Sequence, residues 1–273
     1  MKRKRNVVLI AIIVVFGLIC LGACVFLIYK TVSEKQTQDM YESIAASYAP
    51  EPVSGTEDYT EPSYSLPVET VPETTKKKVE SKANIVQLSS DNPDIYAWIY
   101  IPDTNVNYPV VQSPTEDNFY LDHDIYKNYS FPGAIYTQSC NKKDWTDRVT
   151  LLYGHNMRNG SMFATLHYFE DKDFFDSHPY IYIYTDNRRL TYEIVTAFDY
   201  DSRHIMNSYD FTKDDVFQKW LDQAKNPRSV SANVRSSTPL SLDSKMIVLS
   251  TCLNGGDGRY LVQGVLINDE PTI

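Results

Sequence analysis

The N-terminus of this chain contains an apolar run that is long enough to cross a lipid bilayer. No charged residue occurs between Val7 and Tyr29, and these 23 positions would form a helix about 35 Å long. The hydrocarbon core of a bilayer is about 30 Å thick, so one such helix spans it. The run therefore predicts a membrane-tethered protein whose folded part lies on one side of the membrane.

Basic residues around this run predict which side that is. Four of them occupy positions 2–5, whereas only Lys30 follows the run closely. Because Lys and Arg gather at the cytoplasmic end of a span, the sequence predicts a cytoplasmic tail at 1–5 and a transmembrane signal-anchor helix at 6–30. Everything after that helix is predicted to be extracellular.

Two other interpretations of the same run stay open. A cleaved signal peptide normally has an apolar core of about 7–15 residues and a small-residue exit, and this run is longer and has no such exit. A bacterial lipoprotein signal could end at Cys24, after Leu21, Gly22 and Ala23, but the residues after Cys24 remain apolar. Both alternatives still export the rest of the chain.

The charge of the exported part excludes one class of partner. The chain has 26 basic and 35 acidic residues, and because five of the basic residues precede Thr31, 21 basic residues remain against 35 acidic ones, a charge of −14. Affinity for nucleic acid comes mainly from clustered Lys and Arg. We therefore expect no nucleic-acid partner.

Residue composition and hydrophobic pattern divide the predicted exported part into two regions. Residues 31–82 are rich in Glu, Ser, Thr, Tyr and Pro and show no hydrophobic period, which predicts a flexible extracellular stalk. Residues 83–273 alternate short apolar runs with turn residues, which is typical of a mainly β domain. About eight such strands favour a barrel or a sandwich, and they are expected at Ala97–Ile101, Tyr108–Val111, Ala134–Tyr136, Val149–Tyr153, Tyr180–Tyr184, Leu190–Phe198, Lys245–Thr251 and Tyr260–Ile267.

One longer helix is predicted between the sixth and seventh of these strands. Thr212 and Asp215 have the spacing of a capping box, apolar side chains from Val216 to Ala224 share one face, and Asn226-Pro227 ends the helix. Shorter helical pieces are expected at Glu116–Asp122, with Tyr120 and Leu121 facing inward, and at Met162–Tyr168.

Two of the four cysteines, Cys140 and Cys252, lie outside the apolar run. An exported pair can form a disulfide, and counting alone leaves that possibility open. Cys252, however, ends an apolar strand, where a side chain is held rigidly at a rim of the fold, as a nucleophile requires. Arg259 opens the next strand after a glycine-rich loop, so neighbouring strand ends could bring the two side chains together.

A catalytic cysteine usually has a histidine or a fixed cation nearby. His155 follows the predicted strand Val149–Tyr153 and would also lie at a strand end. The other histidines, His123, His167, His178 and His204, are expected to be packing or surface residues. No metal-binding spacing such as H-E-x-x-H or C-x-x-C occurs, so we expect neither a metal nor another cofactor.

At these residues the sequence resembles the sortases, the membrane-anchored cysteine transpeptidases of Gram-positive bacteria. The resemblance is carried by Leu152-Tyr153-Gly154-His155-Asn156-Met157, by Leu249-Ser250-Thr251-Cys252 and by Arg259, and it covers 84–268. Upstream stretches such as Trp98–Thr104 and Tyr108–Gln112, together with the longer helix, are similar to class B of the family.

The resemblance implies a closed eight-stranded β-barrel and transpeptidation at a sorting signal near the C-terminus of a substrate protein. Cys252 would form a thioester with the substrate, His155 would serve as acid and base, and Arg259 would hold the oxyanion. Leu121, Ser250 and Thr251 are expected to contact the substrate.

The partners implied by the resemblance are surface proteins, and the acceptor is an amine of a peptidoglycan precursor. A pilin-polymerising sortase, with pilin subunits as substrate and acceptor, is an alternative. Another class of function stays open as well, a non-catalytic binding module stapled by a disulfide between Cys140 and Cys252. The short loop between Cys252 and Arg259 departs from the family pattern and leaves the acceptor amine undefined.

Overall fold

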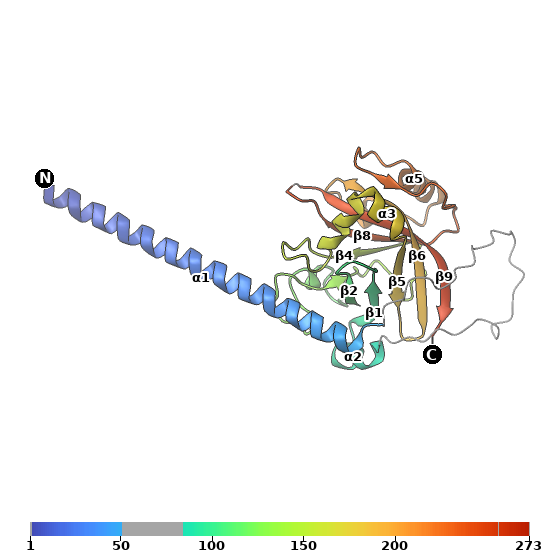
Figure 1. Ribbon diagram of the computed structural model, residues 1–273, viewed down its shortest axis with the longest axis horizontal. Helices are drawn as coiled ribbons and strands as arrows, with labels where there is room; N and C mark the ends of the chain where they lie inside the picture. The colour runs from blue at the N-terminus through green and yellow to red at the C-terminus, as the bar shows by residue number, and fades with distance from the viewer. Residues whose placement is uncertain (1, 51–83, 256, 273) are drawn as a thin grey trace, which may run out of the picture.

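A computed structural model describes residues 2–50, 84–255 and 257–272 of this chain. It consists of a long N-terminal helix that projects from a β-barrel with short helices around it (Figure 1). The helices are α1 (Lys2–Tyr48), α2 (Ile85–Asp91), α3 (Lys172–Ser177), α4 (Ile205–Ser208) and α5 (Asp214–Lys225), with 3₁₀ helices η2 (Phe119–Leu121) and η3 (Ala164–Glu170). The strands are β1 (Ile95–Tyr100), β2 (Asn107–Val111), β3 (Ile135–Tyr136), β4 (Val149–Tyr153), β5 (Tyr180–Tyr184), β6 (Arg188–Tyr200), β7 (Asn233–Val234), β8 (Met246–Cys252) and β9 (Arg259–Pro271).

Eight of these strands close into a barrel. Their order is β5-β1-β2-β3-β4-β8-β9-β6, and pairing between β5 and β6 completes the ring, while β7 is a short extra strand beside β6. The predicted closed eight-stranded barrel is confirmed, and each of the eight predicted strands overlaps an observed one. β4 pairs with β8 in parallel, and β8 pairs with β9 in antiparallel orientation.

Strand β8 is apolar on both faces because both faces are covered. Ile247 and Leu249 belong to the cluster inside the barrel, whereas Met246 and Val248 belong to a second cluster formed with α5 on the outside. Side chains of a strand alternate between its two faces, so a continuous apolar run suits a strand buried on both sides. This packing fixes β8 up to its last residue, Cys252.

Helix α5 lies between β6 and β8 in the chain, as predicted, and covers the outer face of the barrel, but its N-terminus differs from the prediction. Phe217, Trp220 and Leu221 are buried against the strands. The helix begins at Asp214 after Lys213, which makes no capping hydrogen bond with its side chain, and the hydroxyl of Thr212 donates instead to Asp210. The predicted capping box is therefore wrong, because the preceding turn uses the Thr212 hydroxyl.

Helix α1 is the one helix of the described residues that is long and apolar enough to cross a membrane. The structure differs from the expected stalk at 31–82, because α1 continues to Tyr48 and packs against the barrel. Tyr41 is buried, donates a hydrogen bond of 2.9 Å to the carbonyl of Gly133 and makes an edge contact with Tyr108. Most of the predicted stalk lies in residues 51–83, outside the described residues.

We expect Tyr41→Ala to loosen this contact and lower the stability of the full chain. Loss of a buried aromatic side chain costs about 3–5 kcal/mol, and Tyr41 is only 3% exposed. Thermal unfolding in detergent should show a Tm several degrees below that of the wild type. Ser47→Ala, at an exposed position of the same helix, is the control, and equal Tm values for the two variants would contradict the contact.

Candidate active site

Three strand ends meet at one rim of the barrel and carry the predicted catalytic residues. Cys252, the last residue of β8, is directly opposite Arg259, the first residue of β9. On the other side of β8, Tyr153 of β4 pairs with Ser250 in parallel register, and the chain continues two residues to His155. The barrel topology thus brings residues from distant parts of the sequence to one edge, with β8 in the middle.

Cys252 and Arg259 are in contact at this rim. The thiol is exposed, and the Arg259 guanidinium Nη1 donates to the sulfur at 3.2 Å. Residues directly opposite each other in an antiparallel pair project from the same face of the sheet. A guanidinium is charged at any relevant pH, so the site holds a fixed cation beside the sulfur.

His155 is half-buried and held by the loop before β3. Its Nε2 donates a hydrogen bond of 2.8 Å to the carbonyl of Leu121, and its ring stacks on Phe131 with 5.5 Å between centroids. This hydrogen bond places the proton of the neutral ring on Nε2. Nδ1 then carries the lone pair and has no hydrogen-bond partner among the residues that the structure describes, so it can accept a proton.

Burial lowers the pKa of the His155 imidazole, and the Arg259 cation lowers it further. The hydrogen bond to Leu121 and the nearby Asp122 carboxylate oppose this shift without cancelling it. The neutral form is therefore favoured down to a lower pH than for an ordinary histidine. Once protonated, the ring is a stronger acid than usual, which suits a group that must both accept and release a proton.

The three expected substrate-contact residues lie at the rim but differ in exposure. Leu121 was expected to face inward, and that is wrong: it is 43% exposed, because the 3₁₀ helix η2 buries Tyr120 and turns the next side chain outward. Ser250 and Thr251 are buried in β8. Substrate contact by any of the three stays a prediction.

Gly133 supports the carbonyl that holds His155. Its φ of +60° is a conformation that other residues rarely adopt, and an added Cβ would lie 2.5 Å from the carbonyl oxygens of both Tyr120 and Leu121. The backbone N–H of Ala134 donates to the carbonyl of Tyr120 at 3.0 Å. A close backbone approach, possible only for glycine, therefore fixes the position of Leu121 and with it the imidazole.

We expect Gly133→Ala to destabilise the chain by about 2–5 kcal/mol, the sum of the left-handed backbone cost and steric overlap. Gly255→Ala is a matched control, because Gly255 also has a positive φ, +84°, but no atom lies within 4 Å of the added Cβ. Thermal unfolding should therefore give a Tm for Gly133→Ala several degrees below that of the control. Equal Tm values would show that the contact with the Leu121 carbonyl imposes no constraint.

Sequence analysis missed a polar cluster beneath the nucleophile. The amide Nδ2 of Asn156 donates to the carbonyl of Cys252 at 3.0 Å and to Oδ1 of Asn254 at 2.8 Å. His167, expected to be a packing or surface residue, has its Nε2 3.0 Å from the same carbonyl and its Nδ1 2.5 Å from Glu170. The H-x-x-E spacing of His167 and Glu170 was the available signal, since residues three apart share a face of a helical turn.

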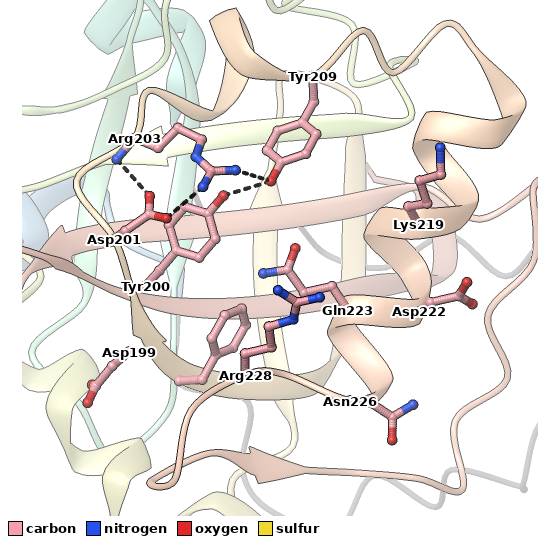
Figure 2. A pocket seen from close by; sticks show the side chains of 11 residues that line it. Asp199, Tyr200, Asp201, Arg203, Tyr209, Lys219, Asp222, Gln223, Asn226 and Arg228 are labelled. Atoms are coloured by element: carbon pink, nitrogen blue, oxygen red, sulfur yellow. Dashed lines mark hydrogen bonds and ion pairs between the residues drawn. The ribbon is translucent and has the colours of Figure 1, made fainter.

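A hollow of about 670 Å³ adjoins the rim on the far side of Arg259. Tyr200, the last residue of β6, pairs with Arg259 and lines the hollow, which opens between this strand and α5 (Figure 2). Arg203 also lines the hollow, and its guanidinium donates to Asp201 at 2.9 Å and to the hydroxyl of Tyr209 at 3.0 Å. Carboxylates and guanidinium groups line the hollow together with the aromatic rings of Phe198, Tyr200 and Tyr209, so its lining mixes charged and apolar groups.

The second cysteine outside α1 is Cys140. Cys140 and Cys252 are both free thiols in the structure. Burial and the nearby Asp117 carboxylate raise the pKa of the Cys140 thiol, which makes it a poor nucleophile. Among the described residues no group of three or more His, Cys, Asp and Glu side chains is placed to hold a metal ion.

Comparison with known proteins identifies the family. The Sortase domain family matches residues 99–267, more than half of the chain. This chain belongs to the sortase family. Its relatives include the sortase B of Listeria monocytogenes, 30% identical over 197 residues that make up 71% of this chain and 78% of that protein. The sortase B of Staphylococcus aureus is 26% identical over 165 residues, 60% of this chain and 66% of that protein.

Solved structures of sortases share the barrel. Sortase B of Clostridium perfringens superposes with a TM-score of 0.61 at 30% identity, covering 67% of this chain and 99% of that one. A Staphylococcus aureus sortase B–substrate complex gives a TM-score of 0.60 at 26% identity, covering 67% of this chain and 84% of that one. The expected resemblance to the sortases, with class B relatives, is confirmed, and sortases are transpeptidases.

Proposed function

We propose that this sortase is an extracellular cysteine transpeptidase that anchors surface proteins to peptidoglycan. The observation that carries the proposal is the 3.2 Å contact between Arg259 and the exposed sulfur of Cys252, at the rim where His155 follows the end of the neighbouring strand β4 by two residues. The sortase B relatives favour wall anchoring over pilus assembly. The N-terminal helix α1 would serve as the membrane anchor, with the tail before it in the cytoplasm.

The first half-reaction cleaves the sorting signal. The Cys252 sulfur attacks the carbonyl carbon of the scissile peptide bond while the thiol proton passes to Nδ1 of His155. Arg259 stabilises the negative charge that develops on the carbonyl oxygen, and the guanidinium needs no reorganisation because it is already beside the sulfur. The C–N bond then breaks, His155 returns the proton to the departing amine, and a thioester on Cys252 remains.

The second half-reaction transfers the acyl group. An acceptor amine attacks the thioester carbonyl, and His155 accepts a proton from the attacking nitrogen. The C–S bond breaks, a new amide forms, and the proton held by His155 returns to the sulfur. The lowered pKa of His155 supports this cycle, since the ring must be neutral before each proton is accepted.

The proposal is tested with the purified full chain in nanodiscs and a library of candidate C-terminal sorting peptides. Without an acceptor, mass spectrometry should detect an acyl adduct on Cys252. With acceptors added, ligation to a cell-wall cross-bridge peptide supports wall anchoring, whereas ligation only to a pilin lysine supports the alternative. A folded chain that forms no adduct on Cys252 with any peptide, or forms one on Cys140, would contradict the mechanism.

The proposed orientation has its own test. In intact cells, a thiol reagent that does not cross membranes should modify Cys252 from outside. Protection of Cys252 until the membrane is permeabilised would place the domain on the cytoplasmic side and contradict the extracellular assignment.

A further inference from the structure

A histidine and a glutamate, with no role in the proton transfers above, lie directly beneath the nucleophile. His167 has 9% of its side chain exposed, and its Nε2 is 3.0 Å from the backbone carbonyl of Cys252 and 3.0 Å from Nδ2 of Asn156. Its other nitrogen, Nδ1, contacts the Glu170 carboxylate. The imidazole therefore connects an acidic side chain to the main chain of the catalytic residue.

The hydrogen-bond inventory shows what each form of this ring can do. The two amide protons of Asn156 already point to the carbonyl of Cys252 and to Asn254. The Glu170 carboxylate requires a proton on Nδ1 of His167. No amide proton of Asn156 is left for Nε2, and the carbonyl of Cys252 can only accept, so Nε2 contacts this carbonyl as a donor. The imidazolium form of His167 therefore donates to the Glu170 carboxylate and to the main chain of Cys252 at the same time.

His167 also contacts the strand that carries Arg259. Its ring stacks on Tyr260 with 4.8 Å between centroids and 24° between planes. Tyr260 is fully buried and follows Arg259 directly in β9. His167 therefore contacts the ends of both β8 and β9. The pairing of these two strands brings the Arg259 guanidinium next to the Cys252 sulfur.

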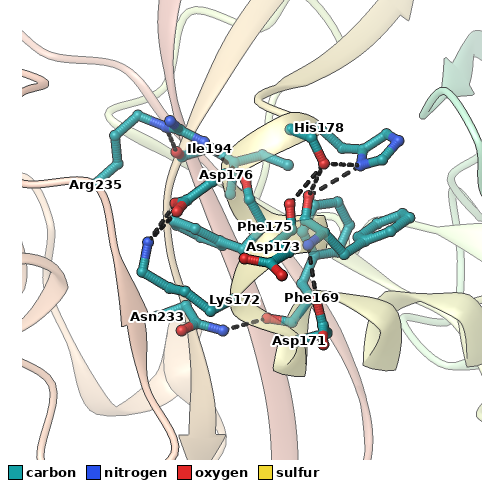
Figure 3. A network of polar contacts seen from close by, with 12 residues as sticks. Phe169, Asp171, Lys172, Asp173, Phe175, Asp176, His178, Ile194, Asn233 and Arg235 are labelled. Atoms are coloured by element: carbon teal, nitrogen blue, oxygen red, sulfur yellow. Dashed lines mark hydrogen bonds and ion pairs between the residues drawn. The ribbon is translucent and has the colours of Figure 1, made fainter.

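The segment that presents His167 and Glu170 is itself fixed to the barrel. The Asn233 side chain of β7 donates to the carbonyl of Phe169 at 2.8 Å (Figure 3). It also donates to the carbonyl of Glu170 at 3.0 Å. Asp171 caps helix α3, which follows, by accepting from the N–H of Phe174 at 2.9 Å. A side chain on such a braced segment can hold a neighbour in place.

We propose that His167, oriented by Glu170, is a positioning residue of this sortase that holds the backbone of Cys252 so that its sulfur stays in line with Arg259 and His155. The proposal rests on the proposed function for its kinetic readout. His167 acts through Cys252 and touches neither the substrate nor the reacting atoms. Misplacing a reacting group by about 1 Å can cost about 100-fold in rate, so loss of one of several supports should cost about 10-fold.

The experiment uses the full chain in nanodiscs with Cys140→Ala as the background, so that Cys252 is the one thiol outside the apolar run. His167→Leu removes both ring nitrogens, whereas His167→Gln keeps an N–H donor near the position of Nε2. His178→Leu makes the same change in a histidine whose ring nitrogens contact the Phe174 carbonyl and Asp103 instead of the main chain of Cys252. The kcat and KM of peptide cleavage, the rate at which iodoacetamide alkylates Cys252, and Tm are measured for each.

We expect His167→Leu to lower kcat about 10-fold with KM changed by less than about twofold, and to slow alkylation of Cys252 about threefold or more. His167→Gln should recover kcat to within about threefold of the background chain, and His178→Leu should leave both rates unchanged. Glu170→Gln, at a half-exposed side chain that should tolerate the change, is expected to lower kcat about threefold without lowering Tm.

Three results would overturn the proposal. His167→Leu could keep kcat and alkylation within twofold of the background chain. His167→Gln could lose as much kcat and Tm as His167→Leu, which would indicate packing alone. His178→Leu could slow both rates equally. Alkylation requires no turnover, so a chain that cleaves no peptide would refute the proposed function and still leave the positioning role of His167 measurable.

Discussion

Replacing Cys252 with alanine is expected to abolish cleavage of sorting peptides, lowering kcat/KM by at least about 10³-fold. The thioester requires the sulfur, and among the described residues outside α1 the only other thiol, that of Cys140, has a raised pKa caused by burial and by Asp117. The acyl adduct detected by mass spectrometry should disappear with the activity. Because the Cys252 side chain is exposed, its removal leaves no cavity and the Tm should stay within about 2 °C.

Cys140→Ala is the matched control for this experiment. It removes the other cysteine outside α1, whose thiol has a raised pKa, so cleavage and adduct formation should continue at the wild-type rate. Comparable cleavage by Cys252→Ala would end the assignment of this residue as the nucleophile. Loss of folding in Cys140→Ala, with Cys140 and Cys252 both unreactive toward a thiol reagent in the unreduced wild type, would instead favour the disulfide-stapled module.

Replacing Arg259 with lysine is expected to lower kcat/KM about 100-fold, although the positive charge is kept. Loss of one donor to a developing oxyanion costs about 10²–10³ in kcat. A lysine ammonium is a compact point charge and cannot reproduce the planar guanidinium that contacts the sulfur at 3.2 Å. The loss should fall on kcat more than on KM, since the oxyanion exists only in the transition state and the tetrahedral intermediate.

Arg188→Lys controls for the chemistry of this substitution. Arg188 pairs with Pro271 at the opposite end of β9 and forms an ion pair with Asp269 at 3.1 Å, far along the strand from Cys252. Its replacement should leave kcat/KM within about twofold of wild type. An Arg259→Lys enzyme with equal activity would show that charge alone suffices and that the guanidinium geometry has no role in the reaction.

The site draws its rigidity from backbone contacts around the catalytic side chains. The carbonyl of Leu121 orients His155, and Gly133 makes room for the turn that presents this carbonyl. The carbonyl of Cys252 accepts a hydrogen bond from the side chain of Asn156 and contacts Nε2 of His167. Pre-arranged groups of this kind lose little entropy when the substrate arrives, which is a main source of catalytic rate.

Much of this protein could be predicted from local patterns in the sequence. The uncharged run before Lys30 predicts the span, because crossing a bilayer depends only on length and polarity along one helix. Strand β8 is recognisable because its apolar residues are contiguous, and the ends of β4, β8 and β9 are marked where polar residues begin. The family motifs then selected Cys252, His155 and Arg259 from the alternatives that residue patterns left open.

Other features depended on residues that are distant in sequence and could not be read locally. Helix α1 continues to Tyr48 because Tyr41 and Ile44 pack on the barrel, although the local composition favours a tether. His167 reaches the Cys252 carbonyl across 85 positions of the chain. Periodicity describes which face of an element is apolar but not which distant group that face meets. The sequence therefore determined the apolar N-terminal helix, the strands and the reactive residue types, while tertiary packing decided which backbone groups hold those residues in place.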